Sequence, residues 1–407
     1  MDRRNFLVGA AGSVLSAQRP NDMTRIGIVG PGGRGTQLLK ECIEFSGKYN
    51  SRVTAVCDIW NQRRDAAAKL VRESYGGAEP KVYRKLDELI GDKSIDAVII
   101  ATPDHAHAKM LKIAVEAGKD VYCEKPMGNV LSELNAAMAA VEKSDRIVQF
   151  GTNRRSWAKY RTAARYIREG RIGDIVKADL IWNFYSPFRW AVSEKELTSL
   201  KESDVDWKEF LYGKPDRPFD PKIYRSFRLF PEFSSGIIDQ HMTHAIDLLH
   251  FLSGELYPMT VVAEGGLFTF KDYRQNYDSV QAVLKYGHGG RRFLATFEEG
   301  LANSAGKATR VMGTLGTIEG EEVYRISGEG SEHPNKIKTP EAIPDEPGTM
   351  HLMANWLDCV RRRDRKGLYC PADAGYGHSV ACIMAVDALA SGPRMTFDPK
   401  RREVHPG

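Results

Sequence analysis

Glycines at three positions of a short loop give this sequence its first candidate binding site. Residues 25–35 read R-I-G-I-V-G-P-G-G-R-G, an apolar run that breaks into a turn containing Gly30, Gly32 and Gly35. Between a strand and a helix, such glycines allow a tight turn, a close approach to a pyrophosphate, and close helix–strand packing. The helix N-terminus adds unpaired N–H groups for phosphate oxygens. The spacing predicts a dinucleotide site, whose other loop residues are Gly33 and Arg34.

An acid stands where such a site would hold the adenosine ribose. A second apolar run, Val53–Cys57, ends in Asp58, 23 residues after Gly35. A carboxylate there accepts hydrogen bonds from ribose hydroxyls and repels a 2′-phosphate, so it favours NAD over NADP. Arg63 and Arg64 follow closely enough to weaken that preference. The alternative is a plain glycine turn with Asp58 as a helix cap, which the agreement of loop, acid and later strands disfavours.

Two further stretches carry side chains suited to proton transfer. Residues 121–127, V-Y-C-E-K-P-M, place Lys125 at the end of a strand. In a parallel sheet its side chain would face the ligand crevice, and the alternative is a lysine that reaches solvent. On a helix over residues 234–252, Gln240, His244 and Asp247 fall along one face. The imidazole of His244 is a candidate general base, because its pKa lies near neutral pH, and Asp247 could orient it.

Two alternatives for the histidines stay open. His241 and His244, three residues apart, could bind a metal ion, but the sequence offers no evident third ligand, so no metal is predicted. His244 could also be a structural histidine on an amphipathic helix.

The elements that would position these residues alternate regularly in the first part of the chain. Strands are expected at Arg25–Val29, Val53–Cys57, near Val82, and at Ala97–Ala101, Val121–Cys123 and Ile147–Phe150. Helices are expected between them, including Asp104–Ala117, capped by Asp104, and Ser132–Lys143. This alternation predicts a doubly wound parallel sheet in a dinucleotide-binding domain over residues 20–150.

The pattern changes after Gly151 and predicts a second, α+β domain over residues 151–407. Short Gly-containing turns join several of its strands, which indicates a mostly antiparallel sheet. The expected strands are Val176–Tyr185, Thr260–Phe270, Ser279–Tyr286, Arg292–Phe297, Arg310–Met312 and Thr317–Glu321. A long insertion, Ser186–Gly254, follows the first strand, and helices at Met350–Arg363 and Asp373–Ser391 close the chain.

Composition excludes several classes of protein. At 407 residues and 42% apolar residues, the chain is long enough for two cores. The net charge of +5 is mild for this length and gives no reason to expect nucleic acid as a partner. No stretch approaches the ~18 apolar residues of a membrane span, so no membrane partner is expected. The six cysteines lack a framework spacing, and Cys57 and Cys123 are expected to be buried free thiols.

The first 17 residues, Met1–Ala17, resemble a twin-arginine export signal. Arg3 and Arg4 precede Phe6-Leu7 and a weakly apolar run rich in Gly and Ala. The resemblance implies an exported, periplasmic protein, and the twin-arginine route would carry it folded with its cofactor bound. If the stretch is instead a disordered basic tail, the protein is expected in the cytoplasm.

Several motifs in this order resemble the Gfo/Idh/MocA family of glucose–fructose oxidoreductase and inositol dehydrogenase. They are the Gly30–Gly35 loop, Thr102-Pro103 with His107, Glu124-Lys125-Pro126, Gly151-x-Asn153-x-Arg155 and His244-x-x-Asp247. The resemblance runs from about Thr24 to the end of the chain. It implies an N-terminal Rossmann domain and a C-terminal α/β domain whose open antiparallel sheet often forms the contact in a homo-oligomer. It also implies a sugar or polyol as substrate.

The resemblance also assigns roles to residues. It makes Lys125 and His244 catalytic, with an aspartate four residues before the histidine, where this chain has Gln240. Asp239, one residue earlier, would point about 100° away on an α-helix unless a bulge re-aims it. Residues expected at the cofactor are Gly30, Gly32, Gly33, Arg34, Gly35, Asp58, Thr102, Pro103, His107, Glu124 and Lys125. Candidate substrate residues are Asn153, Arg155, Tyr185, Trp207, Arg225, Arg228 and His241.

The function that follows is an NAD-dependent oxidoreductase acting on a sugar, polyol or sugar derivative. Hydride would pass from a carbinol carbon to the nicotinamide while His244 takes the hydroxyl proton and Lys125 stabilises the alkoxide. Because an exported enzyme has no free NAD pool, a redox-neutral glycosidase or lyase with internally recycled NAD is an alternative. A non-catalytic sugar-binding or regulatory protein is the third interpretation, disfavoured by the intact Lys125 and His244.

Overall fold

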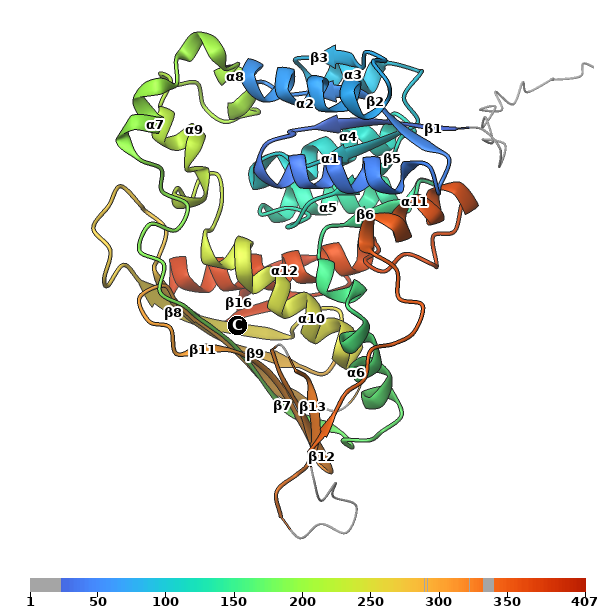
Figure 1. Ribbon diagram of the computed structural model, residues 1–407. Helices are drawn as coiled ribbons and strands as arrows, with labels where there is room; N and C mark the ends of the chain where they lie inside the picture. The colour runs from blue at the N-terminus through green and yellow to red at the C-terminus, as the bar shows by residue number, and fades with distance from the viewer. Residues whose placement is uncertain (1–22, 289, 291, 322, 332–339) are drawn as a thin grey trace, which may run out of the picture.

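Two β-sheets with helices between them organise the chain (Figure 1). The computed structural model describes residues 23–288, 290, 292–321, 323–331 and 340–407. The expected export signal, Met1–Ala17, lies outside the described residues. Along the described part of the chain, no helix has both the length and the apolarity to cross a membrane.

The N-terminal sheet has six parallel strands in the order β3-β2-β1-β4-β5-β6. The strand order reverses between β1 and β4, which places the ligand crevice beside the end of β1. The predicted doubly wound sheet is therefore confirmed, with boundaries that differ by one or two residues. The strands are β1 (Thr24–Val29), β2 (Ser51–Cys57), β3 (Lys81–Tyr83), β4 (Ala97–Ile100), β5 (Asp120–Cys123) and β6 (Val148–Phe150).

Helices cover both faces of this sheet. Buried apolar side chains such as Leu38, Leu39 and Cys42 recur at helical spacing on α1 and pack against the strands. The Asp104 side chain does not cap the helix that follows β4, as the sequence had suggested; its carboxylate points elsewhere. The elements are α1 (Gly33–Ser46), α2 (Asn61–Ser74), α3 (Leu86–Gly91), η1 (Asp104–Ala106), α4 (His107–Glu116) and α5 (Leu131–Glu142).

The second sheet has ten strands in the order β14-β13-β12-β11-β7-β10-β9-β8-β15-β16. All described pairings in it are antiparallel except β10 with β7, so the expectation of a mostly antiparallel sheet is confirmed. The strands are β7 (Ile175–Asn183), β8 (Thr260–Gly266), β9 (Ser279–Tyr286), β10 (Phe293–Gly300), β11 (Gly306–Gly313), β12 (Gly316–Gly320), β13 (Arg325–Gly328), β14 (Glu341–Ala342), β15 (Met395–Asp398) and β16 (Glu403–Pro406).

One face of the second sheet is covered by helices that also contact the first domain (Figure 1). The 20-residue helix α12 (Ala372–Ser391) packs on β8 and on α5 and β6, and its central residues are almost all buried. Beside it lie α10 (Thr243–Ser253) and α6 (Ala158–Arg168), preceded by the short turns η5 (Ile238–Met242) and η2 (Asn153–Ser156). These elements form the layer between the two sheets.

The insertion between β7 and α10 reaches back to the N-terminal domain (Figure 1). Val205 forms a β-bridge with Trp60, and the Asp206 amide donates to the Ile59 carbonyl at 3.0 Å. An aromatic cluster that includes Phe210, Tyr224 and Phe233 gives the insertion a core of its own. Its short elements are α7 (Glu194–Ser199), η3 (Glu202–Asp204), α8 (Trp207–Leu211), α9 (Pro221–Arg225) and η4 (Phe227–Leu229).

The late helix α11 (Leu352–Arg362) crosses the predicted domain boundary. The sequence had placed residues 151–407 in the second domain, but α11 packs against α1 and completes the N-terminal core. Trp356 is fully buried there, with its ring 5.7 Å from that of Tyr122 in an edge-to-face arrangement. The N-terminal domain is therefore closed by a segment some 200 residues further along the chain.

We expect Trp356→Ala to destabilise the whole N-terminal domain, because it removes a large buried ring and leaves a cavity. The expected loss is about 3–5 kcal/mol in the free energy of unfolding. Chemical denaturation followed by circular dichroism measures it. Phe188→Ala, at a ring that is 76% exposed, is the control and should change stability by less than about 0.5 kcal/mol. Equal effects of the two substitutions would show that α11 is not part of this core.

Candidate active site

The glycine loop has no room for a side chain at Gly30 or Gly35. Gly30 has a positive φ of +75°, and a Cβ on it would lie 2.9 Å from the Ala101 carbonyl oxygen. A Cβ on Gly35 would overlap the Gly30 carbonyl oxygen. Helix α1 starts beside this loop with no side chain capping its first N–H groups. The residues present thus fit a dinucleotide, because they leave both the space and the donors that a pyrophosphate needs.

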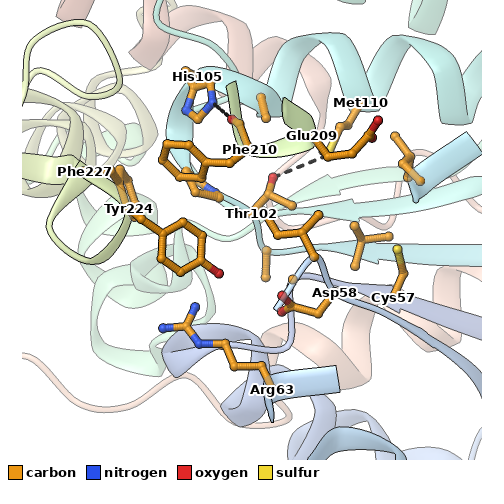
Figure 2. Close-up of a pocket in the computed structure, with 18 of the residues that line it drawn as sticks. Cys57, Asp58, Arg63, Thr102, His105, Met110, Glu209, Phe210, Tyr224 and Phe227 are labelled. Carbon is orange, nitrogen blue, oxygen red and sulfur yellow. Dashed lines mark hydrogen bonds between the residues drawn. The ribbon is translucent and has the colours of Figure 1, made fainter. Parts of the chain in front are cut away.

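The loop opens into a cavity of about 260 Å³. Its other walls are the ends of β2 and β4, with Asp58, Thr102 and Pro103, and residues of the insertion. Figure 2 shows Tyr224 and Phe227 of the insertion on the side opposite Thr102, with Asp58 and Arg63 below them. The cavity is therefore shared by segments more than 100 residues apart.

Asp58 lies at the adenosine end expected from its position after β2. Its Oδ1 accepts a hydrogen bond from the Trp60 amide at 2.8 Å. Burial raises the pKa of Asp58 to about 6, against the opposing effects of that hydrogen bond and of Arg63 and Arg64. Arg63 lies over the Trp60 ring and also lines the cavity. A carboxylate and a guanidinium thus occupy the same end of the site.

Two residues expected at the cofactor lie behind the cavity instead. Glu124 accepts from Arg34 Nε at 2.8 Å, and the ring nitrogens of His107 lie 2.8 Å from the Thr102 and Pro126 carbonyl oxygens. Neither residue lines the cavity. Direct cofactor binding by His107 and Glu124 therefore stays a prediction, and their contacts hold the ends of β4 and β5 in place.

Lys125 crosses from the N-terminal domain to the helix layer. Its Nζ donates to the Asp239 and Gln240 carbonyl oxygens at 3.1 and 2.9 Å, and to Gln240 Oε1 at 3.3 Å. Burial lowers the pKa of Lys125, while Asp104 and Glu124 oppose that shift. Three acceptors match the three donors of an ammonium group. The sequence alternative of a lysine reaching solvent is excluded, because the residue is buried.

A π-helical turn explains how Lys125 reaches these carbonyl groups. Residues Ile238–Met242 form η5, and its wider turn presents the Asp239 and Gln240 carbonyl oxygens to Nζ. The carboxylate of Asp239 is turned to the Ser235 amide at 2.8 Å and to Asn129. The bulge therefore does not bring Asp239 into the position where the resemblance implies an acid; Gln240 stands there.

The Gln240 side chain links several polar groups. Its Oε1 accepts from Arg228 Nε at 2.9 Å, and its Nε2 donates to Asp104, which also accepts from Ser234 Oγ at 2.7 Å. Asp104 is 3% exposed. The role of Asp104 in this network could not be predicted from residue order, because an acid at the start of a helix is normally a cap.

His244 lines a second cavity, of about 570 Å³, together with Lys125 and Gln240. Its Nδ1 is buried and has no hydrogen-bond partner in the described part of the chain. Burial, followed by the charges of Lys125 and Arg154, lowers the pKa of His244 well below its usual range. The imidazole is therefore neutral at neutral pH, as a proton acceptor must be.

The two cavities meet at one side chain. Arg228 lines both of them. Its guanidinium is held by Gln240, the residue that also binds Lys125. The groups suited to proton transfer thus stand next to the space that fits a dinucleotide.

Comparison with known proteins assigns both domains. Residues 24–152 match the family described as "Oxidoreductase family, NAD-binding Rossmann fold" (GFO_IDH_MocA), and residues 214–396 match its C-terminal alpha/beta domain. The chain belongs to this oxidoreductase family. Its N-terminal domain is the NAD-binding domain of the family, and the resemblance stated from the motifs is confirmed at this level.

Relatives in the family act on sugars and polyols according to their names. Inositol 2-dehydrogenase 1 of Saccharopolyspora erythraea is 33% identical over 45% of this chain and 52% of its own length. Inositol 2-dehydrogenase of Rhizobium meliloti is 26% identical over 67% of this chain and 68% of its own. The chain thus spans only about half to two thirds of these relatives. A levoglucosan dehydrogenase solved with NADH has the same fold, with a TM-score of 0.68, 18% identity, and coverage of 92% and 98%.

Within this family member, the motif His244-x-x-Asp247 does not form a histidine–carboxylate pair. Both carboxylate oxygens of Asp247 accept from Arg155 Nε at 2.9 Å, and His378 Nδ1 lies 3.4 Å away. All three side chains are buried beneath the cavity. The expectations that Asp247 orients His244 and that Arg155 binds substrate are therefore wrong; the two form a structural ion pair.

The remaining substrate candidates divide into three groups. Asn153, His241 and Arg228 line the His244 cavity. Arg225 lines the dinucleotide cavity instead. Tyr185 is 62% exposed and lines neither cavity, and Trp207 is packed in the insertion with its Nε1 donating to the Arg217 carbonyl at 2.7 Å. Tyr185, Trp207 and Arg225 therefore lie outside the His244 cavity, where the substrate is expected.

Several residues of the His244 cavity were not anticipated. They come from α6, β7, β11 and the insertion, and only the tertiary fold brings them together. They are Arg154, Trp157, Lys159, Tyr160, Trp182, Arg189, Trp190, Lys307 and Glu321. Among the residues that the structure describes, no group of three or more His, Cys, Asp and Glu side chains could hold a metal ion, and all six cysteines are buried free thiols.

Replacement of Asp58 by serine should shift cofactor preference toward NADP. The substitution removes the carboxylate that would repel a 2′-phosphate and leaves Arg63 available to it. We expect the ratio of NADP to NAD affinity to rise roughly tenfold or more, equivalent to about 1.4 kcal/mol. Calorimetric titration of the cofactor-free protein measures both affinities.

The control for this substitution is Asp65→Ser, at an exposed position in α2. It should leave the affinity ratio unchanged. An unchanged ratio in Asp58→Ser would mean that the adenosine ribose is bound elsewhere.

Proposed function

We propose that the protein is an NAD-dependent oxidoreductase that acts on a sugar, a polyol or a sugar derivative. The observation that carries this proposal is the position of Lys125 and His244 in one cavity that meets the dinucleotide cavity at Arg228. The names of the inositol dehydrogenase relatives support the substrate class.

The chain's own groups supply the proton chemistry of such a reaction. NAD, when bound, supplies the acceptor for hydride from a carbinol carbon. The neutral imidazole of His244 takes the proton from the carbinol oxygen. The Lys125 ammonium stabilises the negative charge that develops on that oxygen, in a site where burial strengthens the interaction. Gln240 and Asp104 hold the ammonium in position.

The aromatic walls of the cavity fit a sugar ring. Trp157, Tyr160, Trp182 and Trp190 line it from three different elements. Aromatic faces pack on the C–H groups of a pyranose, while Asn153 and Arg154 can bind its hydroxyl groups.

A redox-neutral reaction with retained NAD is the second candidate, and the insertion favours it. The insertion covers the dinucleotide cavity and is attached to the N-terminal domain by the Val205–Trp60 bridge. His105 Nε2 lies 2.8 Å from the Phe210 carbonyl oxygen, and Arg84 pairs with Asp206 at 3.2 Å. A cofactor enclosed in this way would leave slowly, so it could be reduced and reoxidised within one catalytic cycle.

A homo-oligomer formed through the second sheet is part of the same proposal. Its outer face carries exposed apolar side chains on neighbouring strands, including Val176, Val262, Val283 and Leu294. A second copy of the chain would remove them from water.

Replacement of Lys125 or His244 by alanine should abolish most turnover and spare cofactor binding. Loss of one charged donor typically costs ~10²–10³ in kcat, and loss of a general base about 10²–10⁴. Stopped-flow absorbance of NADH formation on mixing with a panel of sugars and polyols measures the rate. His405→Ala, at an exposed position, is the control and should match the parent. Parental rates in both active-site variants would contradict the assignment.

We also propose that residues 1–17 direct export by the twin-arginine route. Arg3→Lys together with Arg4→Lys is then expected to trap a folded, NAD-loaded precursor in the cytoplasm, because this route reads the arginine pair. Cell fractionation with immunodetection measures the distribution, and the parent chain should be found outside the cytoplasm. Normal export of the double variant would contradict the proposal.

A further inference from the structure

The His244 cavity carries an excess of positive charge that the chain does not neutralise. Six cationic side chains line it: Lys125, Arg154, Lys159, Arg189, Arg228 and Lys307. Among the described lining residues, the only carboxylate is that of Glu321, which lies 3.8 Å from Lys307 Nζ. A neutral sugar would leave this charge uncompensated within a partly desolvated site.

Arg154 and Arg228 form no ion pair with an acidic side chain among the described residues. Arg154 lies over the Trp182 ring at 4.4 Å, and Arg228 donates to the amide oxygen of Gln240. Lys307 lies over the same indole ring at 5.2 Å. Arg154 and Lys307 are therefore held against one aromatic side chain; Lys307 also faces Glu321, whereas Arg154 forms no ion pair among the described residues.

Glu299 is a buried carboxyl group that contacts His241 of the cavity wall. Glu299 Oε1 accepts from His241 Nδ1 at 2.6 Å, next to the cavity wall. Burial raises the pKa of Glu299 well above its usual range, which disfavours the charged carboxylate. His241 in turn has its pKa lowered, first by burial and then by Arg189 and Lys125. Asp104 and Glu124, which do not line the cavity, offset part of the charge of Lys125 and Arg228.

The phosphates of a dinucleotide do not explain this charge either. Arg154, Lys159, Arg189 and Lys307 line the His244 cavity and not the dinucleotide cavity. They come from η2, α6, β11 and the insertion, all of which belong to the second domain.

Building on the proposed function, we propose that the substrate is an acidic sugar, whose carboxylate or other oxyanion binds Arg154 and Lys307. A planar guanidinium matches two oxyanion oxygens, and the Trp182 face next to it would pack on the sugar ring. The ring hydroxyl near Lys125 and His244 then undergoes the redox step. The oxyanion of the sugar makes the site selective for acidic substrates. Its negative charge also offsets the positive charges around His244.

The test compares matched sugars on the NAD-loaded enzyme. Methyl glucuronoside and methyl galacturonoside are each compared with their methyl ester and with the neutral methyl glycoside. A sugar phosphate and a sugar sulfate show whether the site prefers a carboxylate, a phosphate or a sulfate. Reduction of bound NAD gives kcat and KM, and the shift of Tm with ligand gives binding without turnover. At least one acid should have a KM at least ~10-fold below its ester, and that KM should rise with ionic strength.

Substitutions then locate the anion site. Arg154→Gln and Lys307→Gln should each raise KM for the acid about tenfold or more and change KM for the ester less than twofold. Arg154→Lys should recover part of the loss. Lys400→Gln removes the same charge at an exposed position outside the cavity and should change neither value.

The outcomes separate this inference from the proposed function. If esters and neutral glycosides are bound and oxidised as well as the acids, the acidic-sugar inference is wrong and the oxidoreductase proposal stands. If no sugar reduces the bound NAD, the proposed function is contradicted. In that case a Tm shift produced by the acids, absent with the esters and lost in Arg154→Gln, would still support the anion site.

Discussion

The buried ammonium group of Lys125 is the constraint around which the two domains are arranged. A charged amine removed from water is tolerated only when its donors are satisfied. Here its acceptors among the described residues belong to Asp239 and Gln240 of the second domain, 114 and 115 residues further along the chain. The hydrogen bonds that stabilise the ammonium therefore also fix the relative position of the Rossmann sheet and the helix layer.

This requirement explains the local irregularity at the start of α10. A regular α-helix directs its carbonyl groups to the amides four residues ahead, so few are free for a lysine. The π-helical turn η5 releases them, and Thr243 Oγ1 donates to the Ile238 carbonyl at 3.1 Å within the same turn. The same turn places Gln240, rather than Asp239, toward the cavity. The Lys125 ammonium therefore bonds a neutral amide at this position, where the family resemblance implies an aspartate.

The sequence predicted those parts of the structure that depend on local spacing. The glycine loop, the alternation of strands and helices up to Phe150, and the positions of Asp58 and Lys125 at strand ends could all be read from residue order. Contacts between side chains from different elements could not be predicted in this way. Helical spacing placed Asp247 near His244, but the carboxylate is taken by Arg155 and His378 from two other elements. For the same reason the role of α11 in the first core, and the cationic lining of the His244 cavity, became visible only in three dimensions.

The positive side chains that line the cavity also influence the protonation of His244. A general base must be unprotonated before the reaction, and the cations Lys125 and Arg154 help to keep the imidazole neutral. After it accepts a proton, the imidazolium stands in the same positive field, which opposes the charge it has gained. A ligand that brings a negative charge into this cavity weakens the opposition, because it offsets Arg154 and Lys307 at close range. The charge of the substrate and the protonation of His244 are therefore coupled through Arg154. This guanidinium would bind the anionic substrate, and without a bound anion it disfavours protonation of His244.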